Sequence, residues 1–570
     1  MLKEQIRLGF TLLFLTLCGQ VTISASNWAP SDCFTKTEGR VILDRARPLS
    51  MQMNRANVIY EVRDDFDLAG STIRLPDGCI IEFNGGKFYN GLVVGEKMPT
   101  KETYRPEDFG AGQSDDTYAI QSCLNICRNV ALDGSYQVSS HFDKKDNVIL
   151  SVPSETSISL KGVLNLSPVD SPRYSILSVK NSTNISITGG GKIIGDKETT
   201  NVTKGEHGMG ISITGESRGI TIEGLDISNC FGDAIYIGVE MRDRTCLEPS
   251  YITVNDCALH HCRRQGISIV IGHHITIDNC DIHDIQGTAP GAAIDIEPQY
   301  KGYKVHDLHI GNSSFNNCVL ALSCGGADKA SYNITVFNCT SDSGPIVWRL
   351  GDNTIFDNCT FKSPLYVDNI KIVYSFVASL YYKGDNKTFD DTPNIIAKNS
   401  KFQVVGCVQP TGYIRMEKCT IDYPSDKKEL NGSPLKGGYL ELIDCSCTGL
   451  GTNYRFAPDI KYLKATNCFF QYNKAVCVQG DVLDLNRCVI KGENVEEDNT
   501  LVYARKGGSR MKRCEVTYLN DKSSKPVWVI RAGEEGGLNV ERTTVLSKNP
   551  KVIKTRNVNQ KSIRFLSERD

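Results

Sequence analysis

Two acidic residues, Asp295 and Glu297, stand two positions apart within residues 292–297, which read AAIDIE. The isoleucines alternate with the acids, as in a β-strand whose apolar side chains face a core. We therefore expect both carboxylates on the outer face of one strand, with Cα atoms about 6.6–6.8 Å apart. Glycoside hydrolysis uses such a pair, one carboxyl protonated and the other ionised. The pattern makes the two acids candidate catalytic residues.

Two earlier segments repeat this strand pattern, at residues 233–238 (DAIYIG) and 265–270 (QGISIV). Aligning all three by their isoleucines places Tyr236 and Asp295 in the same outward row. Asp233 then lies two strand spacings, or about 9.6 Å, from the acid pair. We expect Asp233 to assist catalysis and Tyr236 to contact a substrate.

Basic and polar residues precede the second of these strands, and more histidines follow it. An arginine can bind an acidic sugar through two parallel hydrogen bonds, or can equally hold a neighbouring carboxylate ionised. Outward arginines and carboxylates on a β-wall are also common as solvated pairs without a function. The residues expected to line a groove with the acids and to bind substrate are His261, Arg263, Arg264, Gln265 and His273.

The elements that must position these residues are revealed by a recurring cysteine. It follows a turn-prone residue and precedes an apolar strand, and successive positions lie mostly about 19–33 residues apart, a spacing typical of solenoids. Leu225, Ser313, Ser400 and Thr543 take the same position in other repeats. The cysteines are Cys257, Cys280, Cys339, Cys359, Cys419, Cys445, Cys468, Cys488 and Cys514.

The chain contains 22 cysteines, so a disulfide framework has to be weighed. Equivalent residues on adjacent coils lie about 4.8 Å apart, whereas a disulfide needs Cβ atoms nearer 3.8 Å. We therefore expect a reduced row of inward-facing cysteines, with a disulfide framework as the alternative. No Cys-x-x-Cys pair is present, so we expect no structural metal site.

Ahead of the repeats, three short runs stand at residues 109–111 (FGA), 115–117 (DDT) and 119–121 (AIQ). They resemble the entry segment of the pectate-lyase-like superfamily, especially its rhamnogalacturonase and epimerase-like branch. The resemblance covers roughly residues 105–400 and implies an all-β fold, a right-handed parallel β-helix. Aspartates before an amphipathic run also predict a short helix that caps its N-terminal end.

Within this superfamily, polygalacturonases carry Asn-Thr-Asp, Asp-Asp and Gly-His-Gly on three successive coils. The aligned segments here are residues 231–233 (FGD), 264–265 (RQ) and 292–294 (AAI). Only Asp233 matches, so the resemblance does not imply hydrolysis of polygalacturonate by that residue set. If the chain is a hydrolase, its acids have moved to the pair at 295 and 297.

The sequence divides into three segments. Residues 1–25 read as a signal peptide, 26–104 as a β-rich lead-in, and 105–570 as the β-helix with an insertion around 363–399. The insertion is rich in aromatic residues and forms either a decorated loop or a rim for sugar rings. We expect an exported protein, periplasmic or extracellular, with a lipoprotein anchored through Cys18 as the alternative. No later stretch is apolar enough to span a membrane.

The formal charge of −2 gives no reason to expect a nucleic acid as partner. The expected partner is a polysaccharide or oligosaccharide, and three hypotheses remain open. The chain is a hydrolase acting through the paired acids without a cofactor, a lyase or uronate epimerase whose acids bind Ca²⁺, or a glycan-binding β-helix without activity.

Overall fold

The computed structural model describes most of the chain from residue 39 onward. The described ranges are 39–139, 147–239, 247–327, 330–349, 351–384, 391–408, 411–423, 435–449, 460–472, 478–492, 500–518, 527–534, 537–548 and 553–567. The expected signal peptide and Cys18 lie outside these ranges.

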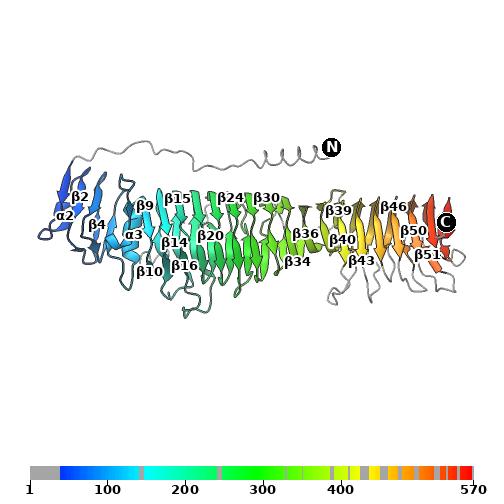
Figure 1. The fold of residues 1–570 in the computed structure, drawn as a ribbon, viewed down its shortest axis with the longest axis horizontal. Helices are drawn as coiled ribbons and strands as arrows, with labels where there is room; N and C mark the ends of the chain where they lie inside the picture. The colour runs from blue at the N-terminus through cyan, green and yellow to red at the C-terminus, as the bar shows by residue number, and fades with distance from the viewer. Residues whose placement is uncertain are drawn as a thin grey trace.

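The described chain forms one long rod of stacked coils, as Figure 1 shows. Each coil contributes short strands that pair in parallel with the equivalent strands of the next coil. In the central region the strands form three walls around an apolar interior. The expected all-β parallel β-helix is confirmed.

The strands of each central wall succeed one another along the rod. Wall 1 contains β12 (Thr156–Leu160), β15 (Thr183–Thr188), β18 (Arg218–Glu223), β21 (Ser250–Asn255), β24 (Gly272–Asp278), β27 (Val305–Gly311), β30 (Ser331–Phe337) and β33 (Gly351–Asp357). Wall 2 contains β13 (Val163–Leu166), β16 (Lys192–Ile194), β19 (Asp226–Ser228), β22 (Ala258–His260), β25 (Asp281–His283), β28 (Ser314–Asn316) and β31 (Thr340–Ser341). Wall 3 contains β11 (Val148–Ser151), β14 (Arg173–Lys180), β17 (His207–Thr214), β20 (Asp233–Gly238), β23 (Gln265–Ile269), β26 (Ala292–Ile296), β29 (Leu320–Cys324) and β32 (Ile346–Trp348).

Walls 2 and 3 merge at β34 (Thr360–Val367), which pairs with both β31 and β32. The expected insertion at 363–399 differs from the structure, because β34, β35 (Ile370–Val373), β36 (Phe376–Tyr382) and β37 (Ile395–Lys398) continue the coils through it. Later strands on the wall-1 side are β39 (Tyr413–Glu417), β42 (Tyr439–Ile443), β44 (Ile460–Thr466), β46 (Val478–Asn486), β48 (Val502–Ala504), β49 (Ser509–Lys512), β51 (Val527–Ala532), β52 (Leu538–Glu541), β54 (Ile553–Arg556) and β55 (Val558–Gln560). Those on the merged wall are β38 (Lys401–Cys407), β40 (Thr420–Tyr423), β41 (Leu435–Lys436), β43 (Ser446–Gly449), β45 (Phe469–Tyr472), β47 (Val489–Gly492), β50 (Glu515–Tyr518), β53 (Thr543–Ser547) and β56 (Ile563–Ser567).

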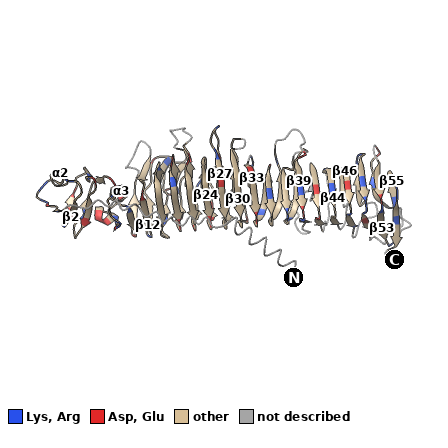
Figure 2. Cartoon of the chain, turned by 90° about the horizontal axis from the view of Figure 1, so that it is seen from above, with Lys and Arg blue, Asp and Glu red and all other residues tan. Residues whose placement is uncertain are grey.

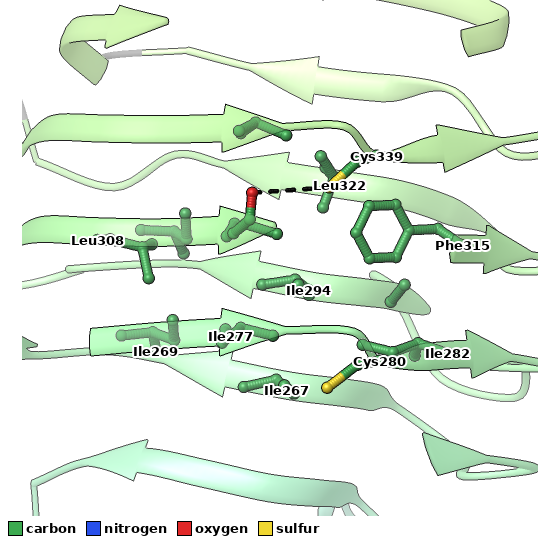
Figure 3. Close-up of a cluster of buried hydrophobic side chains, with 14 of the residues drawn as sticks. Ile267, Ile269, Ile277, Cys280, Ile282, Ile294, Leu308, Phe315, Leu322 and Cys339 are labelled. Carbon is green, nitrogen blue, oxygen red and sulfur yellow. Dashed lines mark hydrogen bonds between the residues drawn. The ribbon is translucent and has the colours of Figure 1, made fainter. Parts of the chain in front are cut away.

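The recurring cysteines point into the core, as the sequence predicts. All nine are at most 3% exposed, and Figure 3 shows Cys280 and Cys339 among isoleucine, leucine and phenylalanine side chains. The residue before each cysteine has a left-handed backbone, such as Asn338 with φ of 51°. Asparagine and aspartate tolerate this conformation better than most residues, which explains why they precede the cysteine so often.

A short helix closes the N-terminal end of the long stack. Helix α3 (Thr117–Ile126) lies between β11 and the N-terminal strand β7, and its Gln121 and Asn125 side chains bond to the backbone on either side. The N-terminal segment forms its own small stack of coils. Its elements are β1 (Arg40–Ile42), α2 (Leu49–Gln52), β2 (Ile59–Val62), β3 (Phe66–Asp67), β4 (Thr72–Arg74), β5 (Ile80–Phe83), β6 (Phe88–Tyr89), β7 (Leu92–Val94), β8 (Thr103–Tyr104) and the 3₁₀ helix Pro106–Phe109. Strands β9 (Asn129–Leu132) and β10 (Ser135–Val138) then lead into the walls.

In Figure 2, Lys and Arg positions (blue) and Asp and Glu positions (red) are interspersed along the ribbon of the described residues. Within the described part of the chain, neither helix has the length and apolar character needed to cross a lipid bilayer.

Candidate functional site

Wall 3 brings the predicted acids together on three consecutive strands. Tyr236 on β20, Ser268 on β23 and Asp295 on β26 are register partners, as the aligned isoleucines predict. Their side chains face away from the core, because the alternating isoleucines occupy the inside. A cover of polar neighbours nevertheless buries this outward row, with Asp295 only 3% exposed. This burial could not be predicted from the alternation of apolar and polar residues along the strand.

Asp295 is held in an environment that favours its protonated form. Gln265 donates from Nε2 to Asp295 Oδ2 at 2.5 Å. Burial, together with the nearby charge of Glu297, raises the pKa of Asp295 to about 7, against the opposing effects of Ser323, Arg264 and Gln265. A carboxyl group with a pKa near neutrality can donate a proton at physiological pH.

Arg264 is the centre of the cluster and binds three carboxylates from three coils. Its Nη2 donates to Glu297 Oε1 at 2.8 Å, and its Nη1 donates to Asp233 Oδ2 at 3.4 Å. Its Nε lies 3.3 Å from Glu206 Oε2. The guanidinium therefore binds the side chain of Glu297, the alternative in which an arginine fixes an acid rather than a sugar.

Several buried polar atoms in the cluster have no hydrogen-bond partner among the described residues. They are His207 Nδ1, Asp233 Oδ1, Arg264 Nε, Gln265 Oε1 and Ser268 Oγ. Burial raises the pKa of Asp233 well above its usual range, against the opposing effect of Arg264. An unpaired buried polar atom costs about 1–3 kcal/mol. Such atoms call for a partner, which water or a bound molecule can supply.

Four residues that the sequence did not indicate belong to the same cluster. Glu206 contacts Arg264, and Gln299 donates from Nε2 to Glu297 Oε2 at 2.8 Å. Ser323 is the register partner of Asp295 on β29. His207 begins β17, and burial lowers its pKa. Extending the strand alignment one coil back, through Ile211 and Ile235, is the signal that locates β17.

Three predicted residues lie outside the cluster. Arg263 donates to the backbone carbonyls of Thr203 and Gly205 and packs its guanidinium over Phe231, so it fixes a loop. His261 is exposed at the corner that follows β22. His273 is a correction of larger scale, because it is the second residue of β24 on wall 1 and does not line a groove with the acids.

A small cavity adjoins the cluster on the N-terminal side of the same wall. Its volume is about 120 Å³. Tyr236 and His207 belong to both regions, so the cavity and the cluster are adjacent on this wall. Its polar and aromatic lining includes Arg173, Tyr174, Lys180, His207, Ser212 and Tyr236.

The cluster does not favour a Ca²⁺ site. Calcium needs several oxygen ligands directed at one point. The carboxylates of Glu206, Asp233 and Glu297 converge instead on the guanidinium of Arg264. The cation that these acids bind is the arginine itself.

Comparison with known proteins agrees with the fold. A family model described as "Right handed beta helix region" matches residues 175–361. The chain is a right-handed parallel β-helix protein. The resemblance to the pectate-lyase-like superfamily is thereby confirmed at the level of the fold, and the matched region contains every residue of the cluster.

Two proteins of Bacillus subtilis (strain 168) are similar to parts of this β-helix. The uncharacterized protein YclG is 27% identical over 285 residues, which covers 45% of this chain and 48% of YclG. The SPbeta prophage-derived uncharacterized protein YorA is 29% identical over 162 residues, covering 26% of this chain and 27% of YorA. The chain thus spans about half or less of the length of these relatives.

Solved structures with a similar fold share little sequence. PfbA, a surface adhesin of Streptococcus pneumoniae, is 11% identical with a TM-score of 0.32, covering 82% of this chain and 92% of PfbA. The tailspike of E. coli bacteriophage HK620, in complex with a pentasaccharide, is 10% identical with a TM-score of 0.38, covering 76% and 75%. The A-module of the Azotobacter vinelandii mannuronan C-5 epimerase AlgE6 is 12% identical with a TM-score of 0.35, covering 81% and 99%.

Proposed function

We propose that this β-helix is a glycoside hydrolase that acts on a polysaccharide or oligosaccharide. Asp295 is the general acid, and Glu297 is the carboxylate base or nucleophile. The observation that carries the proposal is the contrast between their environments. Burial gives Asp295 a pKa of about 7, whereas Arg264 pairs with Glu297 at 2.8 Å. Two carboxyl groups in such different environments divide the roles of acid and base.

The proposed reaction gives a role to the three acids and to their polar neighbours Gln265 and Ser268. Asp295 protonates the leaving glycosidic oxygen while Glu297 activates water or attacks the sugar carbon. Asp233 assists by fixing Arg264, and thereby Glu297. The unpartnered atoms of Gln265 and Ser268 offer hydrogen bonds to sugar hydroxyl groups. No cofactor is needed for this chemistry.

The neighbouring cavity is the proposed site for a sugar ring next to the cleaved bond. Its aromatic residues, Tyr174 and Tyr236, suit an apolar sugar face, and its hydroxyl groups suit sugar hydroxyls. Arg173 at the same cavity suits a carboxylate on the sugar. An exported location completes the proposal, because the pattern of residues 1–25 supports export.

The lyase and epimerase alternatives receive less support. As expected from the sequence, they assign Arg263 or Arg264 to neutralise a uronate carboxylate. Arg264 already binds three carboxylates, and Arg263 is held by two backbone carbonyls and an aromatic ring.

The burial of Asp295 favours a second candidate function, a glycan-binding β-helix without turnover. At 3% exposure, the carboxyl group reaches a glycosidic oxygen only if its cover of side chains moves. In this candidate the acids only stiffen the wall, and the cavity alone binds sugar.

The decisive experiment screens plant, animal and bacterial polysaccharides for release of reducing ends. On a cleaved polymer, Asp295→Asn and Glu297→Gln are expected to lower kcat by about 10²–10⁴-fold, the usual contribution of a general acid or base. Glu417→Gln is the matched control, because Glu417 pairs with Lys398 at 2.8 Å on the opposite wall. Unchanged turnover in both acid variants would contradict the hydrolase, and an unsaturated product would indicate a lyase. Binding without turnover, insensitive to both substitutions, would establish the second candidate.

A further inference from the structure

Histidines gather at the corner between walls 2 and 3, away from the acid cluster. The last residues of successive wall-2 strands are register partners, and each is followed by a residue with left-handed backbone. On two adjacent coils these corner pairs are His260 with His261 and His283 with Asp284. The equivalent corner residues on the flanking coils are Asn229 and Asn317.

Three nitrogen and oxygen atoms converge at this corner. One ligand atom from each of His261, His283 and Asp284 lies within 4.8 Å of the other two. The His283 to Asp284 distance is 2.7 Å, and the His261 to Asp284 distance is 3.8 Å. Ligands of a tetrahedral ion with bonds of about 2.0–2.1 Å lie about 3.3 Å apart. Small side-chain rotations bring the three atoms to that spacing.

A chain of hydrogen bonds prepares His261 as a ligand. Asp226 pairs with Lys192 at 2.9 Å and accepts the Nε2–H of His260 at 3.0 Å. His260 Nδ1 then accepts the Nδ1–H of His261 at 2.7 Å. The lone pair of His261 is left on Nε2, the atom that faces Asp284. Metal-binding histidines are typically oriented by such a partner on the second ring nitrogen.

We propose that His261, His283 and Asp284 form a binding site for a divalent transition-metal cation such as Zn²⁺. Imidazole and carboxylate ligands suit these ions. On binding, the ion takes the place of the proton shared by His283 Nδ1 and Asp284 Oδ2, and the neutral imidazole carries its proton on Nε2 instead. Asp284 Oδ1 accepts from Asn317 Nδ2, which directs Oδ2 to the ion. Three protein ligands leave a fourth position for water.

A second histidine doublet provides an internal comparison. His273 and His274 on wall 1 approach each other through their Nδ1 atoms at 2.6 Å, and His274 also has a left-handed backbone. The outer nitrogen of His273 lies 4.0 Å from Glu248, too far for a hydrogen bond. Among the described residues, only the corner at His261 gathers three ligand atoms within 4.8 Å.

The test is a titration of the full chain with Zn²⁺ by calorimetry. We expect one tight equivalent, and an affinity at least about tenfold lower in His261→Asn and Asp284→Asn. Asparagine is chosen because it occupies the equivalent corners at 229 and 317, so both variants keep the backbone. Asp226→Ala keeps all three ligands and is expected to weaken binding about 10–100-fold, because it releases His260. His274→Asn is the matched control and should titrate like the unmodified chain.

Titration with Co²⁺ tests whether the ion binds to cysteine thiolates instead of to the proposed histidine and aspartate ligands. A sulfur-to-cobalt charge-transfer band would assign the ion to thiolates and overturn the proposal. The proposal also fails if the unmodified chain binds no equivalent of Zn²⁺, if His261→Asn binds as tightly as the unmodified chain, or if His274→Asn loses binding to the same extent.

Discussion

At the scale of single residues, Asp295 combines a carboxyl group with an environment that disfavours its charge. Its pKa of about 7 in the folded chain exceeds the unfolded value of about 3.9. Between these two pH values the folded state binds more protons than the unfolded state. Stability therefore falls as pH rises from about 4 to above 7.

Asp295→Asn is expected to remove this loss of stability. The variant should match the unmodified chain near pH 4 and exceed it at pH 8, by on the order of a few kcal/mol for a shift of this size. Thermal unfolding across this pH range measures the difference. Glu417→Gln is the control of opposite sign, because Lys398 lowers the pKa of Glu417 and its charge stabilises the fold at neutral pH. An Asp295→Asn variant less stable than the unmodified chain at pH 8 would contradict the prediction.

Aligning the chain's own strands by their isoleucines could predict which residues of this cluster share a row, but not which side chains contact one another. Side chains along a strand alternate between its two faces, which determines the residues that share a row. Tyr236 and Asp295 lie in the same outward row, as predicted. Arg264 has a long side chain whose torsions the alignment does not determine, and it reaches Glu206 on a coil that the alignment did not include. The same pattern misplaced His273, because it does not show where a turn ends and the next wall begins.

At the scale of elements, most side chains at the recurring cysteine position can donate a hydrogen bond. The Cys339 thiol lies 3.3 Å from the carbonyl oxygen two residues earlier, and the Ser313 hydroxyl lies 2.6 Å from the equivalent carbonyl. Ser313 Oγ also accepts the backbone N–H of Cys280 at 3.0 Å. These carbonyls also accept a backbone N–H from the neighbouring coil, Asn279 N–H on Gly311 and Asn312 N–H on Phe337, so the side chain supplies a second donor. Serine and threonine replace cysteine at 313, 400 and 543, whereas Leu225 fills the same position without a donor. The sequence could predict the inward direction but not the donor role.

Ser313→Ala is therefore expected to destabilise its coil more than Ser313→Cys. Alanine leaves the carbonyl of Gly311 and the N–H of Cys280 without this side-chain partner, at about 1–3 kcal/mol. A cost of 1.4 kcal/mol speeds local opening about tenfold. Amide hydrogen exchange in residues 275–282 and 308–316 measures the effect, with residues 440–447 of a distant coil as the internal control. Equal protection in the two variants would show that only the size of the side chain matters.

At the scale of the whole molecule, each coil contacts mainly its neighbours, so stability is distributed along the rod. Helix α3 is the exception, because it joins two stacks. Gln121 bonds to Ser151 on the long β-helix, while Ser122 and Asn125 bond to Val93 of the N-terminal coils. The sequence predicted the helix from its caps and apolar face. The contact of α3 with the N-terminal coils could not be predicted in the same way. The strands of those coils, such as β3 and β6, are too short to show a period in the sequence.

Leu124→Asp tests whether this helix is the structural link between the two stacks. Leu124 is fully buried in the junction, and an unpaired carboxylate there costs several kcal/mol. Because coils contact mainly their neighbours, we expect the N-terminal coils to separate while the walls beyond β11 keep their structure. Limited proteolysis should then cut near residues 95–105 and leave a resistant fragment that begins close to β9. Tyr118→Asp on the exposed side of the same helix is the matched control and should resist cleavage. Loss of strand structure along the entire chain in Leu124→Asp would show instead that the rod unfolds as one cooperative unit.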